Sequence, residues 1–283
     1  MKTVLITGAT SGFGKGLVRR FLEEGFRVVA TGRNLLNRSD LLATEREKFK
    51  DLLIEKNLDV TSSADRETIG SYFSQNALDI LINNAGFAVF GPAEECTEEK
   101  MRHQFEVNFF GLVLLTQKLL PAIRKSQGHI INFSSVFGFM GFPLSSLYCA
   151  SKYAVEGFSE SLSYEMKPFG VRVTLIEPGA YRTNFNANAE WGMKPSTENS
   201  AYALQIHNYT NLRKNLSTRP NPPNPEDVVE GVIRIVAKTC PKLNYTFGKD
   251  ALLTRFMKKT MPRALFHKVT GRVLNKIFMK ELS

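Results

Sequence analysis

A tyrosine and a lysine four residues apart, Tyr148 and Lys152, are the residues of this chain best suited to proton transfer. On a helix this spacing puts both side chains on one face. A free tyrosine has a pKa of about 10, and a neighbouring lysine cation favours the phenolate and lowers that pKa. Ser135 lies thirteen residues upstream, and its hydroxyl could hold a carbonyl or alcohol oxygen beside the tyrosine. The pattern predicts a proton-transfer site for a C–O centre.

A glycine-rich motif near the start of the chain favours the binding of a dinucleotide. An apolar run at residues 2–7 leads directly into Gly8, Gly12 and Gly14, and a helical pattern follows at residues 15–24. In such a unit the glycines let the backbone approach a pyrophosphate, and the helix N-terminus supplies free N–H groups and the positive end of its dipole. The spacing is G-x-x-x-G-x-G, which differs from the commoner G-x-G-x-x-G.

These motifs, with others, resemble the short-chain dehydrogenase/reductase family from residue 1 to about residue 185, with order and spacing kept. The others are Asn83-Asn84-Ala85-Gly86, Asn108 and Pro178-Gly179-x-x-x-Thr183. Within the family, the surrounding pattern is most similar to the hydroxysteroid and retinol dehydrogenases.

The resemblance implies four catalytic residues. Tyr148 is expected to exchange a proton with the substrate oxygen, and Lys152 to lower the tyrosine pKa and hydrogen-bond the nicotinamide ribose. Ser135 is expected to fix the substrate oxygen, whereas the adjacent Ser134 is expected to be structural. Asn108 matches the asparagine that interrupts its helix and holds a water for proton relay.

The resemblance also implies the cofactor-binding residues. Asp59 and Val60 are expected at the adenine, Asn84 on the adenosine side and Thr183 at the carboxamide. Besides Tyr148 and Lys152, the full set is Gly8, Ser11, Gly12, Phe13, Gly14, Arg33, Asp59, Val60, Asn84, Ala85, Gly86, Pro178, Gly179 and Thr183.

The end of the second predicted strand indicates which cofactor is bound. NAD-specific members carry an acidic residue there for the ribose hydroxyls, but this chain has Gly32 followed by Arg33. A guanidinium matches the geometry of a 2′-phosphate, so we expect NADP(H) rather than NAD(H). Lys15 and Arg38 are weaker candidates for the same phosphate, and the alternative for Arg33 is a solvated loop arginine.

Strand-like and helix-like segments alternate along the chain, which is typical of a parallel sheet wrapped by helices. We predict a single α/β domain at residues 1–250, a doubly wound Rossmann-type parallel sheet with helices on both faces. The strands are predicted at residues 3–6, 27–31, 56–59, 80–82, 129–133, 172–177 and 243–247. The motif residues follow these strands, at the edge where such sheets bind ligands.

Two predicted helices, residues 98–126 and 147–169, are richer in large apolar residues than one sheet face requires. The equivalent helices pair between subunits in the family, which implies a homodimer or homotetramer; the alternative is that both faces belong to the core. Residues 184–225 match the position of the substrate-binding lid, a segment that closes over bound substrate. The alternative for this polar, aromatic-spotted stretch is a surface insertion.

Residues 251–283 form a basic amphipathic helical extension, with eight Lys and Arg against one acidic residue. Such a helix can lie on an anionic membrane. The alternative, which we favour, is that its apolar face packs on the domain or on a partner subunit. Because the net charge of +10 is concentrated in this tail, the main domain is nearly balanced, and we expect no nucleic-acid partner.

Composition and cysteine usage indicate a cytoplasmic protein, with membrane association open through the tail. The three cysteines are scattered, as expected of reduced thiols, and neither they nor the four histidines have the spacing of a metal site. No stretch approaches the roughly 20 apolar residues of a spanning helix, and we expect no signal peptide because the first residues are predicted to form a strand that the fold needs. Glu177, at the end of a predicted strand, is expected to be structural.

Apolar residues follow the fourth predicted strand and fill the segment between the serine and the tyrosine, which suits a bulky hydrophobic ligand. They are Phe87, Val89, Phe90, Phe137, Phe139, Met140, Phe142 and Leu144. The sequence therefore predicts an NADP(H)-dependent oxidoreductase that transfers hydride to or from an apolar ketone, aldehyde or secondary alcohol resembling a steroid, retinoid or lipid. The alternatives are a 3-oxoacyl-thioester reductase and a non-catalytic NADP(H)-binding regulatory protein, against which the complete set of catalytic residues argues.

Overall fold

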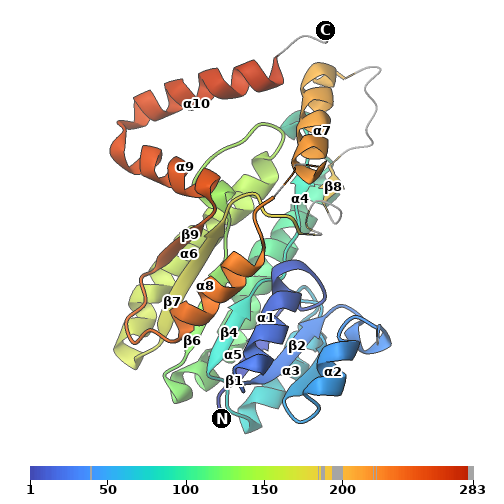
Figure 1. Ribbon diagram of the computed structural model, residues 1–283, viewed down its shortest axis with the longest axis vertical. Coiled ribbons are helices and arrows are strands. Elements are labelled where there is room, and N and C mark those ends of the chain that lie inside the picture. The colour runs from blue at the N-terminus through green and yellow to red at the C-terminus, as the bar shows by residue number, and fades with distance from the viewer. Residues whose placement is uncertain are drawn as a thin grey trace.

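A seven-stranded parallel sheet forms the centre of the computed structural model, which describes residues 1–38, 40–183, 185, 189–192, 200–218, 220 and 222–279 (Figure 1). The strand order is β3-β2-β1-β4-β6-β7-β9, and each neighbouring pair is parallel. This arrangement confirms the predicted doubly wound α/β fold. The strands are β1 (Thr3–Ile6), β2 (Arg27–Gly32), β3 (Leu53–Asn57), β4 (Ile80–Asn83), β6 (His129–Phe133), β7 (Arg172–Pro178) and β9 (Asn244–Phe247).

Helices cover both faces of the sheet, because successive strand residues point to opposite sides. In β1, Val4 and Ile6 pack with α1 and α8 on one face, whereas Leu5 packs with α3, α5 and α6 on the other. The helices are α1 (Gly12–Glu23), α2 (Ala43–Lys48), α3 (Ser63–Gln75), α4 (Glu98–Phe105), α5 (Gly111–Ser126), α6 (Ser146–Met166), α7 (Ala203–Thr218), α8 (Glu226–Val236), α9 (Lys249–Thr260) and α10 (Arg263–Phe278).

Most predicted strands lie within one or two residues of the observed ones, but the third was placed wrongly. It was predicted at residues 56–59 and is observed at Leu53–Asn57. This edge strand is only half-buried, so its own apolar pattern is weak. Leu58 and Val60 are buried just beyond its end and shifted the prediction toward the turn.

The helix predicted at residues 98–126 is divided. A π-helical turn, Glu106–Phe110, separates α4 from α5. By length and composition alone, Glu98–Ser126 is long and apolar enough to cross a membrane, because an 18-residue window within it has a mean hydropathy of 1.2. Core helices can meet the same criterion, and α5 buries Leu115 and Leu119 against the sheet.

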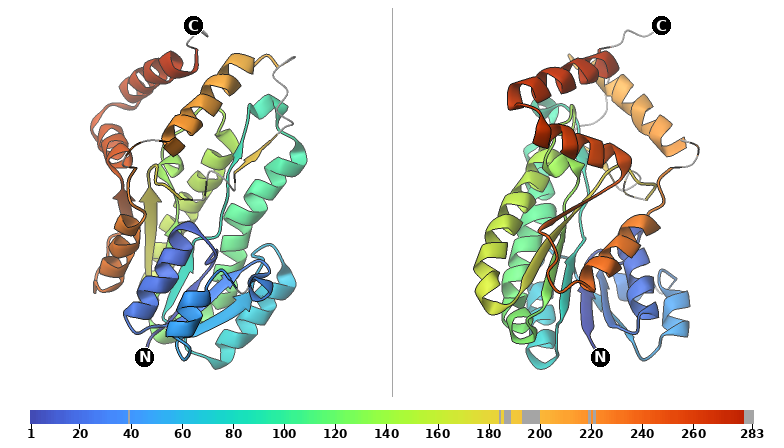
Figure 2. Two further views of the ribbon diagram at one scale, coloured as in Figure 1. Left: turned by 45° about the vertical axis from the view of Figure 1, so that its right-hand side comes forward. Right: turned by 60° about the vertical axis from the view of Figure 1, so that its left-hand side comes forward.

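The last two helices and a small second sheet lie at the carboxyl edge of the central sheet (Figures 1 and 2). The helices α9 and α10 follow β9, and α10 packs on α7. A small second sheet pairs β5 (Val89–Phe90) with β8 (Glu190–Trp191). Parts of the predicted lid (residues 184, 186–188, 193–199, 219 and 221) and the end of the predicted tail (residues 280–283) lie outside the described residues.

Candidate active site

The glycine-rich turn after β1 is joined to the loop after β4 by hydrogen bonds. Asn84 Nδ2 donates to the carbonyl oxygens of Thr7 (2.9 Å) and Gly8 (3.1 Å), and the Thr7 hydroxyl accepts from the N–H groups of Asn84 and Ala85, both at 3.0 Å. Gly8 has a φ of +65°, and a Cβ on Gly14 would lie 2.1 Å from the Gly8 carbonyl oxygen. Neither position has room for a side chain, so the turn presents bare backbone.

The first turn of α1 offers backbone N–H groups to an anion. Within the described chain no side chain caps this turn, and the Ser11 hydroxyl makes no capping bond. A Cβ built on Gly12 would lie 3.5 Å from Cβ of Thr183, so the turn faces the segment after β7. Uncapped N–H groups at the positive end of a helix dipole suit a pyrophosphate. The residues present therefore fit a nicotinamide dinucleotide.

Arg33 is exposed and lies just past β2, next to the glycine-rich turn. The contact is made by the preceding residue: a Cβ on Gly32 would lie 2.7 Å from Cγ2 of Thr10. Among the described residues, no acidic side chain forms an ion pair with Arg33. The guanidinium is thus close to the turn that would hold a cofactor and is not neutralised there.

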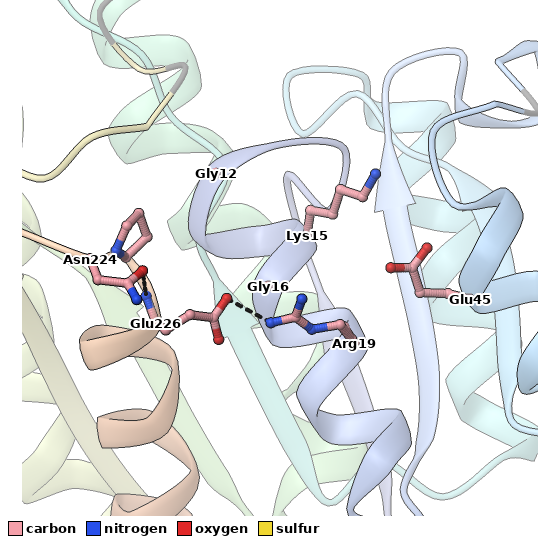
Figure 3. A pocket seen from close by; sticks show the side chains of 8 residues that line it. Gly12, Lys15, Gly16, Arg19, Glu45, Asn224 and Glu226 are labelled. Carbon is pink, nitrogen blue, oxygen red and sulfur yellow. Dashed lines mark hydrogen bonds and ion pairs between the residues drawn. The ribbon is translucent and has the colours of Figure 1, made fainter. Parts of the chain in front are cut away.

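A second cation, Lys15, lines a cavity of about 270 Å³ beside α1 (Figure 3). Arg19, one turn further along, is directed to Glu226 of α8 and forms an ion pair with it at 2.7 Å. Lys15 points away from this pair in Figure 3 and has no ion pair with any residue that the structure describes. The two cations therefore differ: Arg19 joins two helices, and Lys15 is available to an anion.

The remaining expected cofactor residues fall at the same edge of the sheet. Asp59 follows β3, where its Oδ1 accepts from the N–H (2.9 Å) and the hydroxyl (2.7 Å) of Thr61. Val60 is buried against α5, because a Cβ on Gly111 would lie 2.7 Å from its Cγ2. Phe13 packs edge-on against the ring of Tyr181, with ring centroids 5.7 Å apart.

The loop after β7, which contains Pro178 and Gly179, is fixed by the C-terminal part of the chain. Gly179 donates its N–H to the carbonyl oxygen of Phe247 in β9 at 2.8 Å. The Asp250 carboxylate of α9 accepts from the N–H of Ala180 at 2.9 Å. Elements after residue 243 therefore help to position this expected cofactor loop.

Tyr148, Ser135 and Lys152 meet at the carboxyl end of β6. Ser135 begins a short 3₁₀ turn, Val136–Gly138, directly after the strand. Tyr148 lies in the first turn of α6, and its hydroxyl is close enough to the Ser135 side chain for the serine to lower its pKa. One turn later, Lys152 Nζ donates to the carbonyl oxygen of Phe133 at 2.7 Å and lies 5.9 Å from the centroid of the Tyr148 ring. All three side chains are buried.

Burial is the largest influence on the ionisation of this group. It raises the pKa of Tyr148 well above the ordinary tyrosine value, and the nearby Ser135 side chain acts in the opposite direction. Burial lowers the pKa of Lys152 to about 8, against the raising effect of Glu156. The expectation that the Tyr148 pKa is lowered was therefore wrong for this structure. At neutral pH Tyr148 is a neutral phenol, the form that donates a proton.

Asn108 lies in the π-helical turn and binds the loop after β4. Its Oδ1 accepts from the Phe87 N–H at 3.0 Å, and its Nδ2 donates to the Phe87 carbonyl (2.9 Å) and to Ser151 Oγ (3.2 Å). A Cβ on Gly86 would lie 3.2 Å from Asn108 Oδ1 and 3.7 Å from Lys152 Nζ. Gly86 is therefore close to both the Asn108 side chain and the Lys152 ammonium group.

Two polar residues in this region were missed by sequence reasoning. Gln104, buried one turn before Asn108, accepts from the Val89 N–H at 2.6 Å and donates to the Phe87 carbonyl at 2.9 Å. Ser151 is the partner of Asn108 on α6. The available signal was the spacing of Gln104 and Asn108, which puts two amides on one helix face.

An aromatic cluster surrounds the Tyr148 ring. Its centroid lies 5.5 Å from that of Phe185, 5.8 Å from that of Phe137 and 6.4 Å from that of Phe90. Four of the predicted wall residues (Phe90, Phe137, Phe142 and Leu144) join this cluster, together with Phe185, Trp191, Ile206, Tyr209 and Phe278 from later segments. The four other predicted wall residues lie outside this cluster: Phe87, Val89, Phe139 and Met140. Two helices far apart in sequence, α7 and α10, therefore contribute to the apolar surroundings of Tyr148.

The described residues contain no group of three or more His, Cys, Asp or Glu side chains that could hold a metal ion. His129 is buried in β6 and bonded to the Thr174 hydroxyl at 2.9 Å, and burial lowers its pKa to about 3. Its role is that of a neutral core residue.

Similarity to known proteins extends over nearly the whole chain. The family model described as short chain dehydrogenase matches residues 2–193. Human retinol dehydrogenase 8 is 33% identical over 96% of this chain and 90% of that protein. A 3-ketodihydrosphingosine reductase of Bacteroides thetaiotaomicron is 41% identical over 65% of this chain and 66% of that protein.

Solved structures share the fold. A short-chain dehydrogenase from Streptomyces avermitilis has a TM-score of 0.80 and 31% identity, over 96% of this chain and 97% of that one. Other structures of this fold hold NADP, NADPH or NAD. A nicotinamide dinucleotide is therefore the cofactor class that accompanies this fold.

Proposed function

This chain belongs to the short-chain dehydrogenase/reductase family, and on that premise we propose that it is an NADP(H)-dependent oxidoreductase acting on an apolar ketone, aldehyde or secondary alcohol. The substrate is steroid-, retinoid- or lipid-like. The observation that carries the proposal is the buried Tyr148 phenol, which lies beside Ser135 and is enclosed by aromatic side chains. This is a proton donor in an apolar pocket, which suits a hydrophobic molecule with one reactive oxygen.

Each side chain of the site has a separate role in the reaction. Bound NADP(H) supplies or accepts the hydride at the substrate carbon. In reduction, Ser135 holds the substrate oxygen, and Tyr148 donates its phenolic proton to that oxygen as the carbonyl becomes an alcohol. Lys152 as an ammonium stabilises the resulting phenolate, and Asn108 holds a water through which the proton is replaced. Because Tyr148 is a phenol at neutral pH, the site is then in the protonation state that reduction requires.

The names of two relatives support a lipid-like substrate. One is a retinol dehydrogenase and the other a 3-ketodihydrosphingosine reductase. The test is NADPH consumption, followed by absorbance, across steroid ketones, retinal, long-chain 3-keto bases, medium-chain aldehydes and a 3-oxoacyl thioester. Turnover of a long apolar carbonyl supports the proposal. Preference for the thioester would favour the 3-oxoacyl reductase alternative, and tight NADPH binding without any turnover would favour a regulatory protein.

Reduction is expected to slow as the pH rises through about 8, because Lys152 loses its proton there. As the pH rises above this value, the free energy of unfolding is expected to increase because of the same lysine. Its folded pKa lies below the unfolded value of about 10.4, so the unfolded chain binds the extra proton between these two values and stability rises with pH. The measurement is kcat/KM for NADPH-dependent reduction from neutral to alkaline pH, with denaturant unfolding in the same buffers. A flat activity profile would contradict the role of Lys152.

The helices α9 and α10 provide a basic, apolar surface for peripheral membrane contact. The apolar side chains of the described tail are of two kinds. Phe266 and Phe278 are buried on the domain, whereas Leu252, Leu253 and Phe256 are 53%, 60% and 65% exposed. The favoured expectation of an apolar face packed on the domain therefore holds for only part of it. The following helix, α10, carries the exposed cations Arg263, Lys268, Arg272 and Lys276. Apolar side chains flanked by cations suit an anionic lipid surface.

Binding to phosphatidylserine vesicles is expected to fall about tenfold or more when Leu252, Leu253 and Phe256 are all replaced by serine, because each buries apolar area in the bilayer interface. Vesicle co-sedimentation measures the bound fraction, and added salt should weaken it. The control replaces Thr254, a half-buried residue of the same helix, by serine. Equal binding by the triple variant and the parent chain would contradict membrane contact through this surface.

The outer faces of α5 and α6 support a homodimer or homotetramer. Leu114 of α5 and Tyr164 of α6 are 37% and 67% exposed, and Phe110, which ends the π-helical turn before α5, is 43% exposed. A face that serves only the core would leave less apolar surface in water. Sedimentation equilibrium of the whole chain measures the assembly, and a monomer at micromolar concentration would contradict it.

A further inference from the structure

Two carboxyl groups, the fully buried Glu177 and the half-buried Glu156, lie behind the catalytic residues and take no part in the chemistry above. Glu177, at the end of β7, is fully buried, and Glu156 projects from α6 toward it. Asn244 Nδ2 donates to Glu177 Oε1 at 2.6 Å and to Glu156 Oε2 at 3.3 Å, and the Thr246 hydroxyl donates to Glu177 Oε2 at 2.6 Å. Both strands at this end of the sheet thus converge on one carboxyl pair.

The cation that balances this pair comes from the C-terminal helix α9. Arg255 Nη2 lies 3.0 Å from Glu177 Oε1, and the guanidinium carbon lies 4.6 Å from the centroid of the Phe139 ring. Lys258, on the same side of α9, donates to the Phe139 carbonyl and to the Tyr153 hydroxyl, the latter at 3.3 Å. Two basic residues of the tail therefore point inward.

The carboxyl pair touches the elements that carry the catalytic residues. Glu156 is one helical turn beyond Lys152 on α6. A Cβ on Gly138 would lie 2.2 Å from Ser134 Oγ and 2.9 Å from Glu156 Oε1, so the turn after Ser135 is pressed directly against this carboxyl group. The helix of Tyr148 and the turn of Ser135 thus share one support.

The electrostatics explain why a cation is needed here. Burial first, and Glu177 second, raise the pKa of Glu156 to about 7, whereas Arg255 lowers it. Charged and titratable groups face Glu156 from three elements: Lys152 and Tyr153 of α6, Glu177 of β7, and Arg255 and Lys258 of α9. Two buried carboxyl groups at close range are costly without a partner cation.

We propose that Arg255 is a positioning residue of the active site. Through Glu177, Glu156 and the Phe139 ring, helix α9 fixes the position of the Ser135 turn relative to the α6 segment around Lys152. The inference rests on the proposed function for its catalytic consequence, but the positioning contact itself is independent of it.

The test compares Arg255→Met with Lys259→Met, an exposed neighbour on the same helix, in the full chain. Hydrogen–deuterium exchange reports local opening. Peptides covering residues 135–145 and 152–158 should exchange about tenfold faster in the Arg255 variant, with β1 and α1 peptides unchanged as the control for global unfolding. Arg255→Lys keeps the charge but loses the planar fork, so its exchange should be intermediate.

Activity supplies the second readout. With a substrate found in the NADPH assay, Arg255→Met should lower kcat about tenfold or more while the Kd for NADPH stays nearly unchanged, because displaced catalytic groups affect the chemical step. Lys259→Met should match the parent chain.

Equal exchange in the Arg255 and Lys259 variants would overturn the inference, as would opening spread evenly over β1 and α1 in both Arg255 variants. A parent chain that reduces no carbonyl, combined with the local exchange difference, would overturn the proposed function and leave the positioning contact supported.

Discussion

Replacing Tyr148 by phenylalanine is expected to lower kcat for carbonyl reduction about a thousandfold, because general acid catalysis contributes roughly 10² to 10⁴ in rate. The ring stays in the aromatic cluster, so the variant keeps its packing against Phe137 and Phe185. Only the hydroxyl and its interaction with Ser135 are lost. The measurement is kcat with saturating NADPH, with the NADPH Kd determined in parallel by fluorescence.

Tyr209→Phe is the matched control for this substitution. Tyr209 belongs to the same cluster, is buried, and has a hydroxyl that is hydrogen-bonded to Ser145 at 3.3 Å. It loses the same atom from the same surroundings and should change kcat less than about tenfold. If both variants fell equally, pocket packing rather than proton donation would explain the loss. If Tyr148→Phe kept most of its activity, another acid would have to be sought.

Arg33→Ala should reduce the preference for NADPH over NADH, measured as the ratio of kcat/KM values, by about 10- to 100-fold. A hydrogen bond to a charged group contributes about 1.5–3 kcal/mol, and each 1.4 kcal/mol corresponds to about a tenfold change. Since NADH has no 2′-phosphate, its own kcat/KM should change little. Lys15→Ala should give a smaller effect in the same direction.

Arg19→Ala is the control for both cations. Arg19 lines the same cavity as Lys15, but it is paired with Glu226 (Figure 3). Its loss should leave the cofactor preference unchanged. A parent chain that prefers NADH, or an unaltered preference in Arg33→Ala, would mean that Arg33 is a solvated loop arginine.

The strands could be predicted because buried parallel strands are continuous apolar runs. The runs at β1 and β6 gave the observed bounds. The edge strand β3 was displaced because burial continued past its end, at Leu58 and Val60. Periodicity reports which residues are buried, and at a sheet edge this differs from which residues are hydrogen-bonded in the ladder.

The candidate site was predictable where its residues form local motifs. Tyr148 and Lys152 lie one turn apart on a helix, and Gly8 and Gly14 lie in one turn. Their ionisation could not be predicted, because the Tyr148 pKa depends on side chains from later segments such as Phe185 that enclose it.

Contacts between segments far apart in the sequence could not be predicted either. Arg255 was grouped with the basic surface of the tail, since nothing near it indicated a partner. Its partner Glu177 lies on another strand, and the pairing depends on how α9 returns to the sheet. A single charged residue in an amphipathic pattern does not reveal toward which side its side chain turns.

The late position of α9 in the chain sets an order of assembly during synthesis. The ribosome releases Glu156 and Glu177 before β9 and Arg255 exist, so the sheet can form its first six strands while the carboxyl pair still lacks its cation. At that stage protonation is the available way to bury both groups. If Arg255 positions this region as proposed, we expect the segments around Tyr148 and Lys152 to become fully ordered only after α9 has been translated.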